Sequence, residues 1–398
     1  GVGMGQLTRP SLLFTLILLA AVPLLSLNMF LPSLGVMATD FQVGYDEMAF
    51  AVSGYLAFTA LIQILTGPLA DRLGRRPVLL VSLGVFTCAS VGCALAQDYT
   101  TFLFFRVLQG AIATGAALSR AVVNDLVPPN QTASMLAYIA MAMSIAPIIG
   151  PALGGLIGDA VGWRSNFWLY TGAGLGLWVL VWAQLPETAE LGKRTLTDFA
   201  KTYLELLQSR YFWSYTIIMA LAIGAFFVFV SGLPLVAGKQ LGMTQAQIGL
   251  GIGSITFGFL VGSFISGRFS AFYKLDTMIL LGRILASLGL LCCLLLLWSD
   301  WLNPVIIFGG TIFVGIGNGL STPSASAAVM QVRKELSGSA SGLSGAVIVL
   351  SGGVFSAFTG VAMSAQPTAF TLVSIMFFLT LTSLLIAILI RYWAPEIE

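Results

Sequence analysis

Long apolar stretches alternate with short polar segments along almost the whole chain. A helix needs about 20 mostly apolar residues to cross the hydrocarbon of a bilayer. Breaking the sequence at charged or turn-rich segments leaves twelve such stretches, at 11–34, 48–70, 78–96, 101–123, 134–157, 166–185, 212–237, 246–267, 277–298, 302–321, 337–363 and 368–390. The pattern therefore predicts an all-α integral membrane fold with twelve transmembrane helices.

The longest polar segment, 186–211, divides these stretches six and six. Within it, Leu196, Phe199, Tyr203 and Leu206 recur at helical spacing among basic residues, which predicts an amphipathic helix on the inner membrane surface. The predicted organisation is an N-terminal cytoplasmic segment at 1–10 that begins with a probable tag scar, a six-helix half at 11–185, the linker at 186–211, a second half at 212–390 and a cytoplasmic tail at 391–398.

Basic residues are distributed unevenly between the two sides of the predicted membrane. If both termini are cytoplasmic, fifteen basic residues fall inside, Arg120 and Arg283 among them, and only Arg164 and Lys239 fall outside. This excess predicts that orientation, because cytoplasmic loops are enriched in Lys and Arg. Arg106 is then the one basic residue expected deep inside a span.

Composition narrows the functional classes. Of 398 residues, 58% are hydrophobic and 9% are charged, against about 25% charged in soluble domains. This excludes a water-soluble globule, a disordered chain and a nucleic-acid-binding protein. The chain has no histidine and no acid in the middle of a predicted span, so we expect no metal site, no cofactor and no enzyme activity.

The loop after the second stretch carries the most specific motif, Gly67-Pro-Leu-Ala-Asp71-Arg72-Leu-Gly74-Arg75-Arg76-Pro. It resembles the loop motif of the major facilitator superfamily, and the resemblance runs over the whole chain. The resemblance implies two pseudo-symmetric six-helix halves with a substrate site between them, and a cytoplasmic latch made by Gly67, Asp71, Arg72, Gly74, Arg75 and Arg76. The alternative is that these arginines only set the topology.

The fourth stretch carries Arg106-Val-Leu-Gln109-Gly, which resembles the span-four motif of the superfamily. The arginine of that motif is linked to proton coupling. A charge inside a span costs at least ~2.5 kcal/mol, so it normally faces a cavity or a partner. Arg106 and Asn28 are expected at similar depth, where they could meet; the alternative is a structural arginine bonded to backbone carbonyls.

The fifth stretch contains Pro147, Gly150, Pro151, Gly154 and Gly155. Its pattern GPxxGG resembles the antiporter motif found in exporters of the superfamily, although it could also be a generic packing face of small residues. The overall resemblance is to twelve-span drug:proton antiporters, and within them to the Bcr/CflA branch of bicyclomycin and chloramphenicol exporters.

Position 28 departs from that branch. Its members typically carry an acid in a stretch like TDMYLP, whereas this chain reads Leu27-Asn28-Met-Phe-Leu-Pro. An amide cannot titrate, so three hypotheses stay open. Asn28 replaces a natural acid by engineering, another acid such as Asp125 or Asp40 couples transport, or the protein is a facilitator that does not use protons.

The resemblance implies an exporter of small, mostly lipophilic drugs, powered by a proton gradient and acting as a monomer in the bacterial inner membrane. A dedicated exporter of a siderophore, nucleoside or amino-acid derivative is the alternative. Residues on cavity-lining spans are candidates for substrate binding beside Asn28 and Arg106, although each could instead pack or face lipid: Tyr55, Gln109, Tyr138, Met141, Phe226, Phe229, Phe257 and Asn318.

Overall fold

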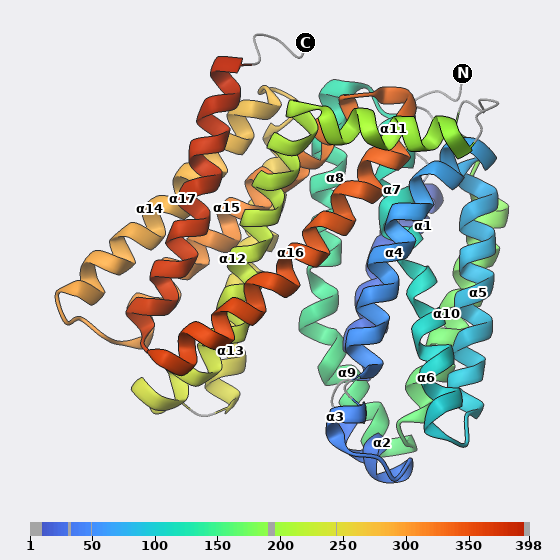
Figure 1. Ribbon diagram of the computed structural model, residues 1–398, viewed down its shortest axis with the longest axis horizontal. Coiled ribbons are helices and arrows are strands. Elements are labelled where there is room, and N and C mark those ends of the chain that lie inside the picture. Colours follow the sequence, from blue (N-terminus) through green and yellow to red (C-terminus); the bar gives the residue numbers. More distant parts are fainter. Residues whose placement is uncertain (1–9, 31–32, 49, 190–195, 244, 394–398) are drawn as a thin grey trace. The chain divides into compact units, whose positions relative to one another are not determined.

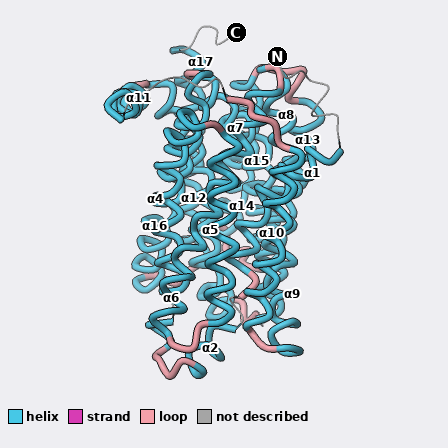
Figure 2. Tube along the Cα trace, turned by 90° about the vertical axis from the view of Figure 1, so that its right-hand side faces the viewer, coloured by secondary structure: helices cyan, strands magenta, loops and turns pink. Residues whose placement is uncertain are grey.

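The computed structural model describes residues 10–30, 33–48, 50–189, 196–243 and 245–393. All regular secondary structure in these ranges is helical (Figure 2). Among the described residues, nine helical stretches are long and apolar enough to cross a membrane.

Helices occupy all twelve predicted stretches, which confirms the prediction of an all-α fold. They are α1 (Pro10–Asn28), α4 (Phe50–Leu73), α5 (Arg75–Leu95), the series α6 (Tyr99–Leu108), η3 (Gln109–Ile112) and α7 (Ala113–Leu126), the pair α8 (Pro129–Met143) and α9 (Ile145–Val161), α10 (Arg164–Gln184), α12 (Arg210–Gln240), α13 (Gln245–Phe269), α14 (Leu275–Trp298), α15 (Pro304–Gln331), α16 (Ser337–Ala365) and α17 (Ala369–Trp393).

Shorter helices lie between these elements: α2 (Leu34–Asp40), α3 (Tyr45–Met48), α11 (Leu196–Gln208) and η4 (Lys334–Leu336). The helix α11 covers the residues for which an amphipathic helix is predicted. Phe199 and Leu206 are buried, and the Tyr203 hydroxyl donates a hydrogen bond to the carbonyl of Ile64 in α4. Burial of this phenol, together with the negative charge of Asp71, raises its pKa.

The chain forms two compact units. Each unit consists mainly of one half of the sequence, but it also includes a short segment from the other half. Unit 1 comprises Gly1–Val127, Ile145–Leu204 and Arg333–Ala346; unit 2 comprises Pro128–Ser144, Glu205–Val332 and Val347–Glu398. The helices α8 and α9 therefore belong to different units, and α16 is divided between them after Ala346.

Unit 1 is built around α5 and α10, which run side by side (Figure 1). Near one end of these helices, Phe102 packs edge-on against Trp163 and Phe167, with ring centroids 5.7 and 5.3 Å apart. The Trp163 indole donates to Asp40 Oδ2 at 2.7 Å, which ties the C-terminal end of α2 to this aromatic cluster.

Unit 2 has a continuous apolar core between α12, α14, α15 and α17. Phe229, Leu290, Val314, Leu372 and Met376 are among its fully buried members. Large apolar side chains such as Val354 and Phe378 are exposed, at 66% and 69%. Such an outward surface suits contact with lipid.

Buried cations correct one expectation from the sequence. Arg106 is fully buried as predicted, but so are Arg75 and Arg283, which are 2% and 0% exposed. Arg283 lies eight residues into α14, about 12 Å along the helix at 1.5 Å per residue. The prediction that Arg106 is the only basic side chain in the interior is therefore wrong. Counting helix edges from hydropathy placed Arg283 too close to the end of its span.

Candidate functional site

The turn between α4 and α5 begins the site in unit 1. Gly74 adopts φ +101°, a left-handed conformation that side chains other than glycine rarely take. Its missing side chain leaves room for the Glu187 carboxylate, which accepts hydrogen bonds from the backbone N–H groups of Arg75 at 3.0 Å and Arg76 at 3.3 Å. Glu187 thus caps the first turn of α5 from the segment after α10.

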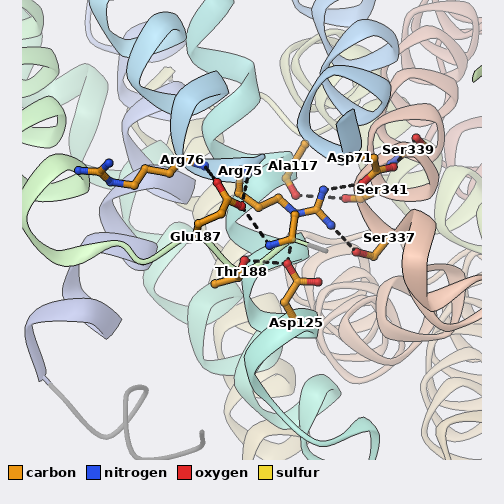
Figure 3. A network of polar contacts seen from close by, with 11 residues as sticks. Asp71, Arg75, Arg76, Ala117, Asp125, Glu187, Thr188, Ser337, Ser339 and Ser341 are labelled. Atoms are coloured by element: carbon orange, nitrogen blue, oxygen red, sulfur yellow. Dashed lines mark hydrogen bonds and ion pairs between the residues drawn. The ribbon is translucent and has the colours of Figure 1, made fainter. Parts of the chain in front are cut away.

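Arg75 is the centre of a polar network in unit 1 (Figure 3). Its guanidinium donates to Asp71 Oδ1 at 2.5 Å, to Asp125 Oδ2 at 3.2 Å and to Ser337 Oγ at 2.9 Å. Because the side chain is buried, two carboxylates and a hydroxyl replace the water that it loses.

The second oxygen of Asp71 extends this network to the start of α16. Asp71 Oδ2 accepts from the backbone N–H of Ser339 at 3.2 Å and from its hydroxyl at 2.7 Å. On the other side, Thr188 Oγ1 donates to Asp125 Oδ2 at 2.8 Å. We call Asp71, Arg75, Asp125, Ser337 and Ser339 the Arg75 network.

The predicted latch residues differ in the contacts that they make in the structure. It brings Asp71 and Arg75 together, and it places Gly67 against the backbone of Ser339, where any side chain would overlap it. The Arg76 guanidinium instead donates to the carbonyl of Trp182 at 2.7 Å, while Arg72 is exposed.

Several members of this region were not singled out as site residues from the sequence. They are the hydroxyl groups of Ser337, Ser339 and Thr188, the carboxylate of Glu187, and Ser341, whose Oγ accepts from Arg120 Nε at 3.1 Å. The one signal in the sequence is the density of serine and glycine from Ser337 onward, which predicts close packing but no particular partner.

Arg106 has a neutral surrounding. It donates to the carbonyls of Ala51 at 2.9 Å and Ser26 at 3.0 Å, and to Gln109 Oε1 at 2.9 Å. Its guanidinium carbon lies 4.2 Å from the ring centroid of Phe30 and 3.9 Å from that of Tyr55. Carbonyl dipoles and two aromatic faces therefore stabilise the charge.

Arg106 and Gln109 are thus brought together, whereas no hydrogen bond joins Arg106 to Asn28, the contact expected from the sequence, among the described residues. Asn28 is half-buried at the end of α1, and its Nδ2 donates to the carbonyl of Leu24 at 2.7 Å. Of the other acids considered for coupling, Asp125 is paired with Arg75 and Asp40 is bonded to Trp163.

The glycine face of α9 packs on α1 close to Asn28. A side chain at Gly154 would overlap the backbone of Met29, and one at Gly150 would lie 3.6 Å from Asn28 Cβ. Pro147 and Gly155 are half-buried on the same helix; the Pro151 side chain lies outside the described ones. The small residues let the two helices approach closely.

The remaining candidates for substrate binding differ in exposure. Tyr55, Gln109, Phe229 and Asn318 are buried in helix packing; Tyr138, Met141 and Phe226 are half-buried; and Phe257 is 54% exposed. Asn318 already accepts a hydrogen bond from Arg283 through Oδ1 at 2.6 Å and donates through Nδ2 to the Ala222 carbonyl at 2.8 Å.

Within the described chain, no three His, Cys, Asp or Glu side chains gather as metal ligands would.

Comparison with known proteins places this arrangement in a family. The model of the Major Facilitator Superfamily matches residues 16–357. An uncharacterized MFS-type transporter of Bacillus subtilis, YdgK, is 29% identical over 93% of this chain and 92% of its own length. A chloramphenicol resistance protein of Pseudomonas aeruginosa is 31% identical over 65% of this chain and 63% of its own. The multidrug resistance protein MdtL of Escherichia coli is 30% identical over 56% of each chain.

Solved structures agree on the fold. The transporter FucP, crystallised in an outward conformation, superposes with a TM-score of 0.78 at 15% identity and covers 98% of this chain and 99% of its own. The human organic anion transporter MFSD10 superposes with a TM-score of 0.71 at 19% identity, over 95% of this chain and all of its own. At these identities the likeness concerns the fold, which comprises twelve helices in two six-helix halves.

Proposed function

Because this chain belongs to the major facilitator superfamily, a family of transporters, we propose that it exports small, mostly lipophilic compounds in exchange for protons. The chloramphenicol and multidrug resistance proteins among its relatives support this substrate class. The chain is a multi-pass membrane protein. We place it in the bacterial inner membrane as a monomer with both termini cytoplasmic, needing no cofactor beyond the proton gradient.

The observation that carries the proposal is the packing of α9 on α1. Gly154 of the antiporter-like motif meets Met29, the residue that follows α1, and Gly150 lies beside Asn28, the position where related exporters carry an acid. The motif thus lies directly against the segment at which protons and substrate would compete. A tight, dry contact there would limit proton leak during transport.

The Arg75 network would act as the cytoplasmic gate of an alternating-access cycle. Asp71 and Arg75 hold the first turn of α16, a helix whose later part belongs to unit 2. Releasing Ser337 and Ser339 from Asp71 and Arg75 would free that turn to move with the rest of α16. The cost of separating buried charge-assisted hydrogen bonds would keep the gate closed until binding elsewhere offsets it.

Coupling to protons would depend on position 28 or on a substitute acid. In the described structure, Arg106 is held by Ser26, two residues before Asn28 on α1, and by Ala51 on α4. A carboxylate at position 28 would feel this nearby cation, which favours its charged form and makes its protonation responsive to substrate. Half-buried Tyr138, Met141 and Phe226 would supply aromatic and thioether contacts to flat apolar substrates.

The test is transport of chloramphenicol in proteoliposomes with an imposed pH gradient, comparing the chain as given with Asn28→Asp. If position 28 carries the proton, only the Asp form shows efflux driven by the gradient. Asn130→Asp, which adds the same charge at an exposed position in the first turn of α8, is the control. Equal coupled transport by both forms would move the coupling to another acid. No transport by either form, with or without a gradient, would refute the drug-exporter proposal.

A second candidate, a dedicated exporter of an anionic metabolite, is favoured by one observation. Among the described residues Arg106 has neutral partners only, so its charge is available to attract an anion. Binding of organic anions and of lipophilic cations to the purified protein separates the two candidates. A preference for the cations would eliminate the metabolite anion.

A further inference from the structure

Arg283 in unit 2 is a buried cation that the proposed transport cycle does not use. It lies on α14, and its side chain is 0% exposed. A charged side chain at this depth of a span is costly and normally has a functional partner. Its surroundings therefore indicate what it does.

Neutral oxygen atoms surround the guanidinium. Nε donates to Ser321 Oγ at 3.2 Å, while NH2 donates to Asn318 Oδ1 at 2.6 Å and again to Ser321 Oγ at 2.9 Å. NH1 makes one long contact, to Ser383 Oγ at 3.4 Å. A guanidinium carries five N–H groups, so one on NH1 is still uncommitted.

The positive charge has no counter-ion within the part of unit 2 that the structure describes. No carboxylate lies within ion-pair distance of Arg283, and the described acid nearest in sequence, Asp276, lies almost two turns earlier on α14 and accepts from the Tyr215 hydroxyl at 2.8 Å. Neutral dipoles stabilise a buried charge only in part.

Two hydroxyl groups, one helical turn along the chain from Arg283 and from its partner Ser383, have no hydrogen-bond partner among the described residues. They are those of Ser287 and Thr380, which are 6% and 0% exposed. Some serines and threonines in these helices bond back to a carbonyl three or four residues earlier, as Thr382 does to Phe378 at 2.8 Å. Ser287 and Thr380 do not, so their donors are left for another group.

Chain direction places both hydroxyls on the same side of Arg283. Ser287 lies one turn after Arg283 on α14, and Thr380 lies one turn before Ser383 on α17. The two helices pack against each other, and the contact between Arg283 and Ser383 joins them at one level. Since α14 and α17 run in opposite directions through that contact, Ser287 and Thr380 fall toward the same end of the helices.

We propose that Arg283, Ser287 and Thr380 form a binding site for a small monovalent inorganic anion such as chloride. Such an ion would accept from the free N–H of Arg283 and from both hydroxyls, and it would balance a charge that water cannot balance. Close packing limits its size, because Gly282 lies against the carbonyl of Gly317 at this level. The proposal is independent of the transported substrate, since it concerns the interior of unit 2 alone.

The test measures thermal unfolding of the purified full-length protein in detergent, in chloride and in gluconate at equal ionic strength. A specific site predicts a saturable rise of at least about 2 °C with chloride, and a similar rise with bromide. The rise should disappear in the double variant Ser287→Ala, Thr380→Val and in Arg283→Gln. It should persist in Thr382→Val, which removes a hydroxyl bonded to its own helix.

An equal melting temperature in chloride and gluconate would overturn the proposal, as would a chloride effect that survives in the double variant. If that variant does not fold, bromide-soaked crystals of the unmodified protein decide the matter. An anomalous peak beside Arg283 supports the site. Ordered water there without bromide refutes it.

Discussion

Arg75 in unit 1 and Arg283 in unit 2 are buried to the same extent but are stabilised in different ways. Arg75 has two carboxylates within 3.2 Å, whereas Arg283 has two hydroxyls and an amide oxygen. The members of the Arg75 network all lie in the first or last turn of a helix, while the partners of Arg283 all lie in the interior of helices. Charge pairing at helix ends suits contacts that form and break. Neutral oxygens inside α14, α15 and α17 suit a set of helices that moves together.

The largest effect is expected for Arg75→Met. It leaves Asp71 and Asp125 buried without a cation, and breaking a buried pair from one side costs about 3–5 kcal/mol. We expect loss of transport and a strongly lowered unfolding temperature, measured in proteoliposomes and by thermal denaturation. Arg75→Lys keeps the charge but not the three-way geometry, and it should recover only part of the stability. Unchanged stability in Arg75→Met would show that the carboxylates around Arg75 do not make its burial more important for stability than that of Arg283.

The next largest effect on stability is expected where two backbones approach closely, near Arg283 and near Arg75. In unit 2, a side chain at Gly317 would overlap the carbonyl of Gly282, and in unit 1 one at Gly67 would overlap the backbone of Ser339. Gly317→Ala and Gly67→Ala should each destabilise the protein by about 1–3 kcal/mol, because backbone has to move. Gly84→Ala is the matched control, since nothing lies within 4 Å of its added carbon. If Gly84→Ala is as damaging as the other two, close approach is not the cause.

Arg283→Met should change stability less than Arg75→Met does. In chloride-free buffer it removes an uncompensated buried charge and leaves only neutral groups behind. We therefore expect the free energy of unfolding to stay within about 1–2 kcal/mol of the unmodified protein, or to rise. Chemical denaturation of both variants under one condition makes the comparison. A loss as large as that of Arg75→Met would mean that neutral partners stabilise this guanidinium as well as carboxylates do.

The smallest effect concerns an exposed ion pair. Arg333 Nε and Glu335 Oε1 are 2.7 Å apart, but their side chains are 41% and 50% exposed. Solvent and salt screen such pairs, so Glu335→Gln should cost no more than about 0.5 kcal/mol and should not alter transport. Thermal unfolding at low and high salt checks this. A salt-sensitive loss larger than that of Gly67→Ala would show that exposure does not weaken charge pairing here.

Apolar periodicity and charge position in the sequence determine most of the architecture. Each of the twelve stretches holds helix, since the need to satisfy backbone groups in lipid leaves few alternatives. The same reasoning places a helix at 196–208, where apolar residues recur at helical spacing. The motif around Asp71 and Arg75 identifies one end of unit 1 as a polar cluster before any contact is known.

Tertiary structure alone decides the partners within that framework. Asp71 meets Ser339 from a segment 268 residues later, and Arg106 bonds Ser26 and Ala51 rather than Asn28. Local pattern cannot specify such pairs, because they depend on which helices pack together and at what register. For the same reason, Arg283 could be counted as a topology-setting residue from its sequence position. Only the packing of α14 against α15 and α17 shows that it is buried among neutral oxygens.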